Sequence, residues 1–593
     1  MPAARRARDQ VPGGRAGGAA RDAGTGQAAA RPSGTGQAAA GPSGAPGRAG
    51  GLGRRLRAMP ATGLVILAAT VLALALRLFL VTRPGFLTSG TVEYDDGVYL
   101  GAAMRLLHGA MPYKDYAFVQ PPGIIVIALP AGLAGAFTSQ ATGLAVARVL
   151  SVLASTACVP LAGRLVRHRG VITCAVAAGL LAVYPADVLS ARTLLLEPWM
   201  NLICLLAATA AFRDGRLAST RWLAWAGVAF GCGVAVKFWA AAPAAVLLAV
   251  CLIARPPAGA SRGGRAGALL GGAAGGFAVL AGPFALADPS GFVHQTLLDQ
   301  VSRTGSTSPL SLRLAHLTGL IDMLTRTGKL ALPGTTAHSL FAMGAEASTR
   351  TVTVGWPAFA AAAAGLAVIA AGYLARVRQR TPLEWFALAT AVLATAAIMY
   401  YSAFFYHYPD FPAPWLAIAA GTAVGSLACL IRGGEPRAGA ARRVVGALVA
   451  VVILAVAAAE ARELEPARVP ASPPSASALV PKGSCLVADQ VSFAIAAYRF
   501  AAPAPGCPDV IDSLATTLAL SGGVSPQGGA GQAPRVVAGW EAIFGKARYV
   551  WLQGGVATRI PWTPALQAWF AAHFRLLAAY PGYGASKLYV RDR

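Results

Sequence analysis

Residues 62–82 read TGLVILAATVLALALRLFLVT, an apolar run long enough to cross a bilayer as one helix. Three basic residues, Arg54, Arg55 and Arg57, stand just before it. Because basic residues collect on the cytoplasmic side of spanning helices, this pattern predicts a cytoplasmic N-terminus and places residues 83–121 outside. Similar apolar runs, separated by short basic segments, continue along most of the chain.

The composition of the whole chain is that of a membrane protein. Of its 593 residues 56% are hydrophobic and only 12% are charged, and the mean hydropathy is +0.56. Soluble domains carry about twice that charged fraction. A net charge of +26 would suggest nucleic-acid binding in a soluble protein. Here the basic residues lie in short loops between apolar runs, so we predict a lipid bilayer as partner and no nucleic acid.

The alternation of apolar runs and basic loops predicts eleven spanning helices. The basic loops, all expected in the cytoplasm, are 164–169, 213–221, 255–265, 376–380 and 432–443. This arrangement requires that one of the runs 122–138 and 143–163 does not cross. We choose 122–138, which is short, as a re-entrant or interfacial segment. The predicted spans are 62–82, 143–163, 171–186, 194–212, 222–239, 241–254, 267–287, 355–374, 385–401, 411–431 and 443–460.

Composition divides the chain into four regions. Residues 1–58 contain the imperfect repeat GTGQAAARPS–GTGQAAAGPS and are predicted to be a disordered basic cytoplasmic tail. Residues 59–465 form the polytopic membrane domain, and 466–481 form a Pro/Ser/Ala linker. Residues 482–593 are predicted to be a small extracytoplasmic α/β domain. The expected fold is therefore an all-α polytopic membrane domain followed by that α/β domain.

The C-terminal region shows strand and helix signals in alternation. Strand-like apolar runs occupy 485–488, 549–552 and 587–590, and an amphipathic helix is predicted over 564–574. Cys485 and Cys507 also lie here, and an extracytoplasmic location would allow them to form a disulfide. The six other cysteines lie in apolar runs and are expected to be small buried hydrophobic residues.

The first predicted external loop holds the most informative motifs. It contains YDDGVYL (94–100), AAMRLLHG (102–109), PYKDY (112–116) and QPPG (120–123). Asp95 and Asp96 stand at the start of a predicted helix over 98–107. Carboxylates at a membrane–water boundary suit a general base or the ligands of a divalent cation. The alternative is that both residues only cap the helix.

These motifs resemble those of the GT-C superfamily, membrane glycosyltransferases that use polyprenyl-phosphate sugars. The superfamily includes the protein O-mannosyltransferases and the aminoarabinose transferases that modify lipid A. The resemblance covers most of residues 60–460 and is strongest at 94–123. It implies that Asp95, with Asp96 beside it, is the catalytic base. Gln120 stands where many aminoarabinose transferases have a basic residue, so the specific sugar and acceptor of that subgroup are not implied.

Other polar residues near the predicted outer ends of spans fit the same resemblance. Lys237, Arg192, His407 and Arg105 are predicted to bind the donor phosphate. For Lys237 the alternative is a side chain that reaches to the membrane interface, and for the aromatic residues around His407 it is an interfacial belt. The residues predicted to contact the sugar or the acceptor are Glu197, Tyr99, Tyr113, Gln120 and Tyr408.

Two further segments have open interpretations. Glu197 follows Arg192 at the start of a predicted span, where an acid could bind sugar hydroxyls or a metal. It could equally be an acid favoured by the dipole at a helix N-terminus. Residues 294–303 have the pattern of an amphipathic surface helix, which we interpret as a lid or a lipid-side element.

The sequence therefore predicts inverting sugar transfer from a polyprenyl-phosphate donor to a glycolipid, glycan or protein acceptor at the outer face of the cell membrane. The requirement for a metal stays open. A transporter or flippase of lipid-linked precursors is the main alternative, but such proteins place polar residues near mid-bilayer in repeated halves. This sequence has no such repeat. A non-catalytic scaffold is the third possibility, and it predicts that Asp95 and Asp96 are dispensable.

Overall fold

The computed structural model describes most of the chain, and all structural statements refer to the described residues. The predicted tail over 1–58 and most of the linker over 466–481 lie outside them. The described ranges are 59–256, 259–302, 310–319, 356–401, 404–431, 435–464, 476–500, 506–522, 533–553, 559–581 and 585–592.

Each of the eleven predicted spans falls on a helix. Five of these helices, α2, α5, α11, α17 and α19, hold apolar segments long enough to cross a bilayer, and the other six hold shorter apolar segments. The chain is thus a multi-pass membrane protein, whereas the number of eleven crossings stays a prediction. The helices are α2 (Ala61–Val81), α5 (Gln140–Leu165), α6 (Val171–Ala182), α8 (Leu196–Ala211), α9 (Thr220–Val236), α10 (Ala241–Ile253), α11 (Arg262–Ala287), α16 (Trp356–Ala375), α17 (Pro382–Tyr400), α18 (Ala413–Ala428) and α19 (Glu435–Leu464).

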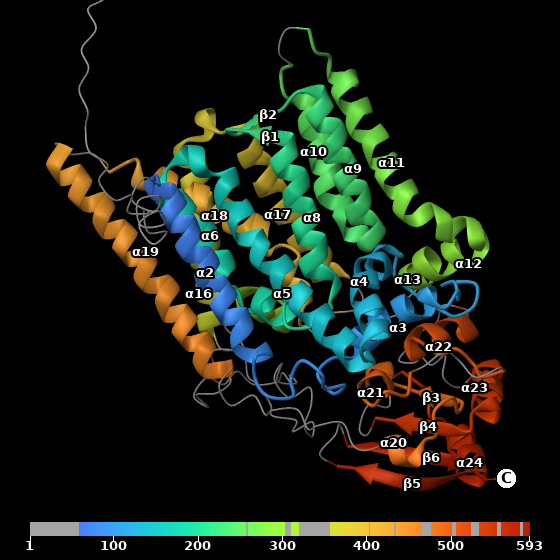
Figure 1. Ribbon diagram of the computed structural model, residues 1–593. Helices are drawn as coiled ribbons and strands as arrows, with labels where there is room; N and C mark the ends of the chain where they lie inside the picture. The colour runs from blue at the N-terminus through green and yellow to red at the C-terminus, as the bar shows by residue number, and fades with distance from the viewer. Residues whose placement is uncertain are drawn as a thin grey trace, which may run out of the picture. The chain divides into compact units, whose positions relative to one another are not determined.

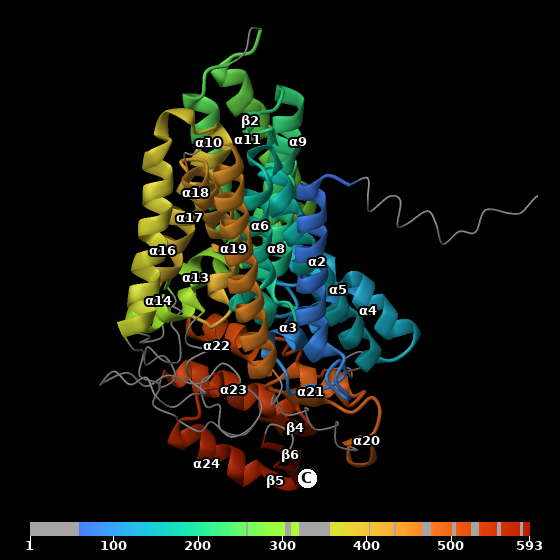
Figure 2. The same cartoon turned by 90° about the vertical axis from the view of Figure 1, so that its left-hand side faces the viewer.

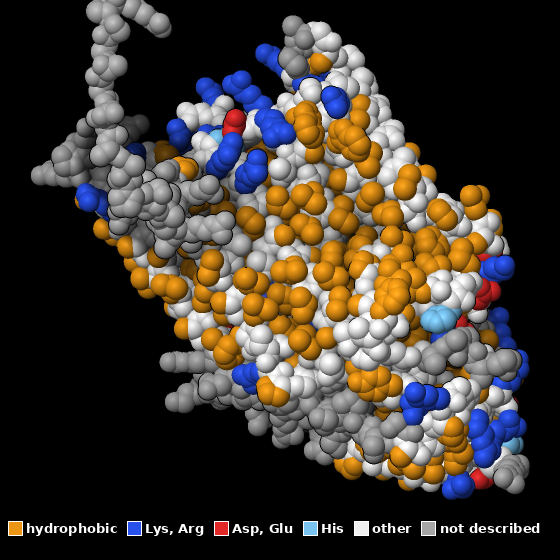
Figure 3. Space-filling view, in the orientation of Figure 1, with side chains coloured by type: hydrophobic (Ala, Val, Ile, Leu, Met, Phe, Trp, Pro, Cys, Tyr) orange, Lys and Arg blue, Asp and Glu red, His pale blue; other side chains and the backbone are white. Residues whose placement is uncertain are grey.

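The surface of these helices is apolar. Figure 3 shows hydrophobic side chains over the middle of one face, with Lys and Arg gathered toward its two ends. Soluble proteins rarely expose so large an apolar surface to water, whereas the lipid tails of a bilayer can cover it. Exposed large hydrophobic residues include Val71, Val279, Leu286, Val392 and Val451.

Glycines allow two of the helices, α9 and α11, to lie side by side at close range (Figure 1). A Cβ added at Gly227 or Gly231 of α9 would come within 2.2 Å of a backbone oxygen of α11. The same holds for Gly272 and Gly276 of α11 against the backbone of α9. Both helices therefore carry a Gly-x-x-x-Gly motif at their contact, the arrangement that brings membrane helices closest together.

Three of the basic loops predicted on the cytoplasmic side contact one another. Arg169, after α5, pairs with Glu384 of α17 at 2.6 Å and also donates to the carbonyl of Gln379. The loop at 213–221 forms a hairpin of β1 (Phe212–Arg213) and β2 (Arg216–Leu217), and the carbonyl of Gly215 in its turn accepts from the backbone of Leu383. These loops lie at one end of the helices, and Figure 1 shows α3 near the other end.

The first external loop folds into two helices, α3 (Tyr94–Leu107) and α4 (Gly123–Phe137). α3 begins four residues earlier than predicted because Glu93 caps it, accepting from the Tyr94 N–H at 2.9 Å. Glu93 is therefore the N-cap residue, so the alternative in which Asp95 and Asp96 cap this helix is wrong. Both carboxylates lie instead in the first turn.

Both ends of α4 lie at the same end of the helix bundle. Gly123 packs on the end of α9, where an added Cβ would lie 2.6 Å from the carbonyl oxygen of Ala235. Gln140, just beyond α4, accepts from the backbone N–H of Phe500 in the C-terminal domain. This geometry favours the prediction that residues 122–138 do not cross the membrane. Figure 2 shows α4 beside the lower part of α5.

The segment predicted as a surface helix over 294–303 is helical in its described part. It consists of α12 (Pro289–Val293), a π-helical turn (His294–Leu298) and α13 (Asp299–Ser302). Gln295 donates to the Tyr113 carbonyl and accepts from the Phe118 N–H, both at 2.9 Å, so the segment rests on the first external loop. Shorter helices complete the membrane part: α7 (Pro185–Ser190) and α14 (Leu310–Thr318).

The C-terminal domain contains a four-stranded sheet with the order β3-β4-β6-β5. β3 (Leu486–Ala488), β4 (Tyr549–Leu552) and β6 (Ser586–Arg591) confirm the three predicted strands. β3 and β4 are parallel, and the other pairs are antiparallel. β5 (Phe574–Tyr580) was not predicted from the sequence. Buried and exposed residues do not alternate along this strand, so it lacks the period-two pattern by which strands are found. The helices are α20 (Ala476–Leu479), α21 (Val491–Ala496), α22 (Ser513–Ser521), α23 (Pro534–Lys546) and α24 (Pro564–His573).

A disulfide and an aromatic core hold this domain together. Cys485, just before β3, is bonded to Cys507. Trp540 and Phe544 of α23 are fully buried, and Phe544 stacks on Trp562. Cross-linking two segments reduces the entropy of the unfolded chain, so the disulfide stabilises the domain beyond its small core.

The C-terminal domain is fixed to the first external loop. Gln490 and Ser492 both donate to the Gly90 carbonyl, at 2.8 and 2.6 Å. The Tyr94 hydroxyl donates to Asp512 at 2.7 Å and accepts from the Ser513 N–H at 2.9 Å. Since Tyr94 opens α3, the domain contacts the same helix turn that carries the two adjacent carboxylates.

We expect Gly97→Ala to loosen this contact. An added Cβ at position 97 would lie 2.2 Å from the Ser492 backbone nitrogen, so α21 would have to move. Overpacking of this kind costs about 1–3 kcal/mol. Limited proteolysis of the purified chain should then release the C-terminal domain faster. The matched control is Gly446→Ala in α19, where an added Cβ meets nothing within 4 Å. Equal release rates for both variants would contradict the packing role of Gly97.

Candidate active site

Asp96 lies at the centre of a buried ion pair. Its Oδ2 accepts from Arg148 Nη2 of α5 at 2.6 Å and from Nε at 3.0 Å, and both side chains are fully buried. Its Oδ1 accepts from the Leu194 N–H, just before α8. Arg148 also donates to the carbonyls of Phe86 and Ser89. Asp96 and Arg148 together therefore connect the first loop to α5 and α8, and both carboxylate oxygens are occupied.

Asp95, the neighbour of Asp96 on α3, forms no ion pair within the described residues. Its side chain is partly exposed, and its described hydrogen bond is a long one from the Tyr99 hydroxyl, at 3.4 Å. Burial, followed by the charge of Glu93, raises the pKa of Asp95 to about 7, while His407 and Arg559 act in the opposite direction. A carboxyl with a pKa near 7 can release and accept a proton at neutral pH.

A second cluster contains Glu197, Lys237 and His407. Glu197 in the first turn of α8 pairs with Lys237 Nζ through one oxygen, and His407 Nδ1 lies 2.9 Å from the other oxygen. Lys237 also lies 3.7 Å from the ring centroid of Trp239 and 4.5 Å from that of Tyr408. All three members of the cluster are buried. Aromatic faces add to the stabilisation of the buried ammonium.

Helix ends position the members of this cluster. Lys237 is the C-cap residue of α9, and His407 precedes a 3₁₀ turn over Tyr408–Asp410. Asn201, one turn after Glu197 in α8, donates to the Asp410 carboxylate at 3.0 Å and to its carbonyl at 2.8 Å. The contact between Asn201 and Asp410 fixes the turn, and hence His407, relative to Glu197.

Tyr406 lies between the two clusters, and its ring lies 5.2 Å from the His407 ring, centroid to centroid. The Tyr406 hydroxyl donates to Glu93 Oε2 at 2.6 Å, and Glu93 is the residue that caps α3. Burial and the charge of Glu93 raise the pKa of Tyr406, and the nearby charge of Arg192 acts in the opposite direction. Arg192 is itself buried, and its Nε has no hydrogen-bond partner within the described residues. A buried cation with an unsatisfied donor is suited to an anionic ligand.

The C-terminal domain adds two charged residues close to Asp95. Asp512 caps α22 and accepts from the Tyr94 hydroxyl at 2.7 Å. The Arg559 guanidinium lies over the Tyr94 ring, 3.5 Å from its centroid. Both charges act on Asp95, and they do so in opposite directions. The domain therefore helps to form the surroundings of Asp95.

The structure brings most of the predicted site residues together and separates a few. Arg105 lies at the far end of α3, where it pairs with Asp509 of the C-terminal domain at 2.6 Å. The structure therefore does not bring Arg105 together with Lys237, and its predicted role in binding the donor phosphate stays a prediction. Tyr113 is buried and donates to the Gln120 carbonyl at 2.6 Å, so its hydroxyl stabilises the loop.

Several residues of the site were missed in the sequence. Arg148 and Arg77 lie within predicted spans, and each pairs with a buried carboxylate, Arg77 with Asp187 at 2.8 Å. A charge inside an apolar run is costly and therefore functional or paired, so both arginines carried a usable signal. No pattern in the sequence marked Glu93 or Arg559, because their roles depend on contacts between distant segments.

The described residues contain no group of three or more His, Cys, Asp or Glu side chains suited to a metal ion. The oxygens of Asp96 face Arg148 and the Leu194 N–H, and those of Glu197 face Lys237 and His407. Protein groups thus already surround the carboxylates that the sequence offered as metal ligands. Asp95 alone does not make a metal site.

The comparison with protein families gives a match in the middle of the membrane domain. Residues 134–256 match the model of the dolichyl-phosphate-mannose-protein mannosyltransferase family. The matched segment runs from the end of α4 to the end of α10 and includes Arg148, Arg192, Glu197 and Lys237. No curated protein sequence matches the chain significantly.

Solved structures match a larger part of the chain. ArnT from Cupriavidus metallidurans bound to undecaprenyl phosphate matches with a TM-score of 0.53 at 13% identity, over 89% of this chain and 98% of that chain. Its apo state matches with a TM-score of 0.51 at 13% identity and the same coverage. The oligosaccharyltransferase AglB from Archaeoglobus fulgidus matches with a TM-score of 0.45 at 14% identity, over 83% of this chain and 69% of that chain.

This chain has the GT-C fold. The resemblance that the motifs of the first external loop predicted is thereby confirmed. At 13% identity the match to ArnT is a match of fold, so the roles of individual side chains rest on the geometry described above.

We expect the two adjacent carboxylates of this GT-C fold to differ in their effect on stability. Asp96→Asn leaves the Arg148 charge buried without its partner, which should lower the free energy of unfolding by about 3 kcal/mol. Asp95 forms no ion pair within the described residues, so Asp95→Asn leaves no partner charge behind and should keep the stability nearly unchanged. Thermal unfolding in detergent can be followed with a thiol-reactive dye, because Cys158, Cys174, Cys204 and Cys251 are buried. Equal unfolding temperatures would rule out the structural role of Asp96.

Proposed function

We propose that this protein is a glycosyltransferase that moves a sugar from a polyprenyl-phosphate donor to an acceptor hydroxyl. The observation that carries the proposal is the arrangement of Asp95, a partly exposed carboxylate with a pKa of about 7, near the buried cluster of Glu197, Lys237 and His407. This is the combination of a base and a cationic site that transfer from a phosphate leaving group requires.

Asp95 acts as the general base in this mechanism. Its carboxylate takes the proton of the acceptor hydroxyl, and the acceptor oxygen forms a bond to the anomeric carbon of the sugar. The bond between that carbon and the phosphate oxygen breaks, and the polyprenyl phosphate leaves with the electron pair. Since the acceptor attacks opposite the leaving group, the configuration at the anomeric carbon inverts. Asp96 does not take part, because its oxygens are bound to Arg148 and Leu194.

The leaving phosphate is stabilised by the cationic groups around Glu197. Lys237 and Arg192 carry positive charge, and His407 can donate a proton or a hydrogen bond. Glu197 offsets one of these charges, so the buried cluster does not carry a large excess of uncompensated charge before the donor binds. Negative charge that develops on the phosphate oxygen strengthens its interaction with these donors, and such preorganised stabilisation is usually the largest catalytic term. Tyr99 and Tyr408 lie around the same space and would contact the sugar.

The donor class follows from the fold and from the predicted topology. ArnT, which shares the fold, binds undecaprenyl phosphate in its solved complex, which supports a polyprenyl carrier here. The three basic loops that contact one another lie at the end of the helices away from α3 (Figure 1). If these loops are cytoplasmic, Asp95 and the C-terminal domain are at the outer face of the cell membrane. The acceptor is then a glycolipid, a glycan or a protein on that side.

We expect Asp95→Asn to abolish transfer while the protein level is unchanged. Loss of a general base typically lowers the rate about 10²–10⁴-fold. Glycolipids, envelope glycans and glycoproteins from cells with the wild-type chain, the variant or a gene deletion would be compared by mass spectrometry. The matched control is Asp214→Asn in the hairpin turn, far from the site, where φ is +47° and Asn is tolerated. A flippase or a scaffold would give the same product profile with Asp95→Asn as with the wild type.

We further expect the pH dependence of transfer to report the pKa of Asp95. The base must be deprotonated, so kcat/KM should rise with pH through about 7. Glu93 raises this pKa, so Glu93→Gln should move the rise to lower pH. Arg559 lowers it, so Arg559→Gln should move the rise to higher pH. Initial rates in membranes between pH 5 and 9 measure these shifts, and shifts in the reverse directions would exclude Asp95 as the base.

A further inference from the structure

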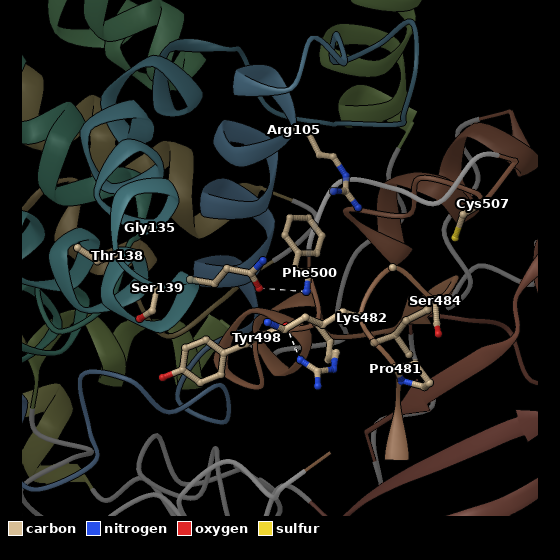
Figure 4. A pocket seen from close by; sticks show the side chains of 14 residues that line it. Arg105, Gly135, Thr138, Ser139, Pro481, Lys482, Ser484, Tyr498, Phe500 and Cys507 are labelled. Atoms are coloured by element: carbon tan, nitrogen blue, oxygen red, sulfur yellow. Dashed lines mark hydrogen bonds between the residues drawn. The ribbon is translucent and has the colours of Figure 1, made fainter. Parts of the chain in front are cut away.

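A pocket of about 320 Å³ lies where the outer ends of α3, α4 and α5 meet the C-terminal domain. The membrane part contributes Arg105, Ser139 and Gln140, and the C-terminal domain contributes Lys482, Arg499 and Phe500 among others. In Figure 4 the Arg105 side chain extends from α3 toward Phe500 and Lys482 on the opposite wall. The volume is in the range of small-molecule sites. Nothing in the proposed mechanism uses this pocket.

The pocket is positively charged. Its lining residues include three basic side chains, Arg105, Lys482 and Arg499, and no acidic one. Asp509, just outside the lining, offsets Arg105 through their ion pair at 2.6 Å. Lys482 is exposed and forms no ion pair within the described residues, so the pocket keeps an excess of positive charge. Such a concave basic surface attracts anions.

The guanidinium groups of this pocket are held in fixed positions. Arg499 donates to the carbonyl of Val480 at 2.6 Å and to that of Tyr498 at 2.9 Å. Arg105 lies 4.1 Å from the ring centroid of Phe500, in addition to its pair with Asp509. Because these side chains are already ordered, binding an anion would cost little further conformational entropy.

The position of the pocket places it at the membrane surface. Ser139 caps α5, which is long and apolar enough to span a bilayer, so the pocket starts at the end of a spanning segment. Phe137, two residues earlier, is 85% exposed and offers a large apolar side chain to lipid beside the pocket. Basic residues next to an apolar anchor at this depth are suited to anionic lipid headgroups.

The pocket is distinct from the donor site. Arg105 follows Asp95 by ten residues along α3, which corresponds to a separation of about 15 Å along the helix axis. Lys237, Arg192 and His407, which we assign to the donor phosphate, do not line the pocket. A lipid phosphate bound here would therefore not be the leaving group of the transfer reaction.

We propose that this pocket binds the phosphate of an anionic lipid headgroup and thereby ties the C-terminal domain to the membrane surface. The phosphate would contact Lys482 and the guanidinium groups, and the acyl chains would extend along the exposed side of α4 near Phe137. Bound lipid would contact α4, α5 and the C-terminal domain at once, so it would stabilise the junction of these elements. This lipid site takes no part in the transfer reaction.

The test uses the full-length chain in nanodiscs of phosphatidylcholine, with or without phosphatidylglycerol. Native mass spectrometry would count retained lipid, and the unfolding temperature would be followed in parallel. The variant is Lys482→Glu, because Lys482 is exposed and its replacement should not disturb folding. The matched control is Lys587→Glu on β6, an exposed lysine outside the pocket.

We expect wild type and Lys587→Glu to retain phosphatidylglycerol and to unfold at a higher temperature in its presence. Lys482→Glu should lose at least tenfold in lipid occupancy together with that temperature shift. If Lys482→Glu and the wild type retained equal amounts of phosphatidylglycerol, the proposal that this pocket binds the lipid would be wrong. If inorganic phosphate alone raised the unfolding temperature and phosphatidylglycerol did not, the proposal that the bound phosphate belongs to a lipid would be wrong. Asp95→Asn should retain the lipid fully, so a failure of the proposed transfer reaction and a failure of the lipid site give different results.

Discussion

The buried ion pair between Asp96 and Arg148 is the constraint on which the candidate site depends. Arg148 comes from a spanning helix, and it binds the first external loop through Asp96 and through two backbone carbonyls. Asp96 in turn accepts from the Leu194 N–H, so the same pair sets the start of α8. Since a buried charge without its partner is strongly destabilising, the loop has little freedom to move away from α5. Both carboxylate clusters are positioned by this contact.

The ion pair also divides the roles of two adjacent aspartates. Neighbouring residues on a helix point about 100° apart, so Asp96 can pair with Arg148 while Asp95 lies near Glu93 and His407. Asp96 is held by donors on both oxygens, whereas burial and the nearby Glu93 raise the pKa of Asp95. Protein donors thus occupy both oxygens of Asp96, whereas the pKa of Asp95, about 7, suits it to exchange protons at neutral pH. Glu93 serves both, since it caps α3 and acts on Asp95 by its charge.

The C-terminal domain is part of the site as well as a neighbour of it. It docks on the first turn of α3 through Tyr94, Asp512 and Ser513, and it places Arg559 over the Tyr94 ring. At the other end of α3 it meets Arg105 through Asp509. A single helix of 14 residues therefore joins the proposed catalytic carboxylate to the basic pocket at the membrane surface. Changes in the seating of this domain would affect both.

The sequence by itself determined the helices of the membrane domain and most of the C-terminal strands, because apolar runs of spanning length and alternating strands are local patterns. It also singled out Asp95, Glu197, Lys237 and His407, since charged or polar residues at the ends of apolar runs are rare. Only the tertiary structure decided that Asp96 pairs with Arg148 and that Arg105 pairs with Asp509. Those assignments depend on partners such as Arg148 and Asp509, far away in the chain, and no local pattern records which distant side chain will neutralise a buried charge.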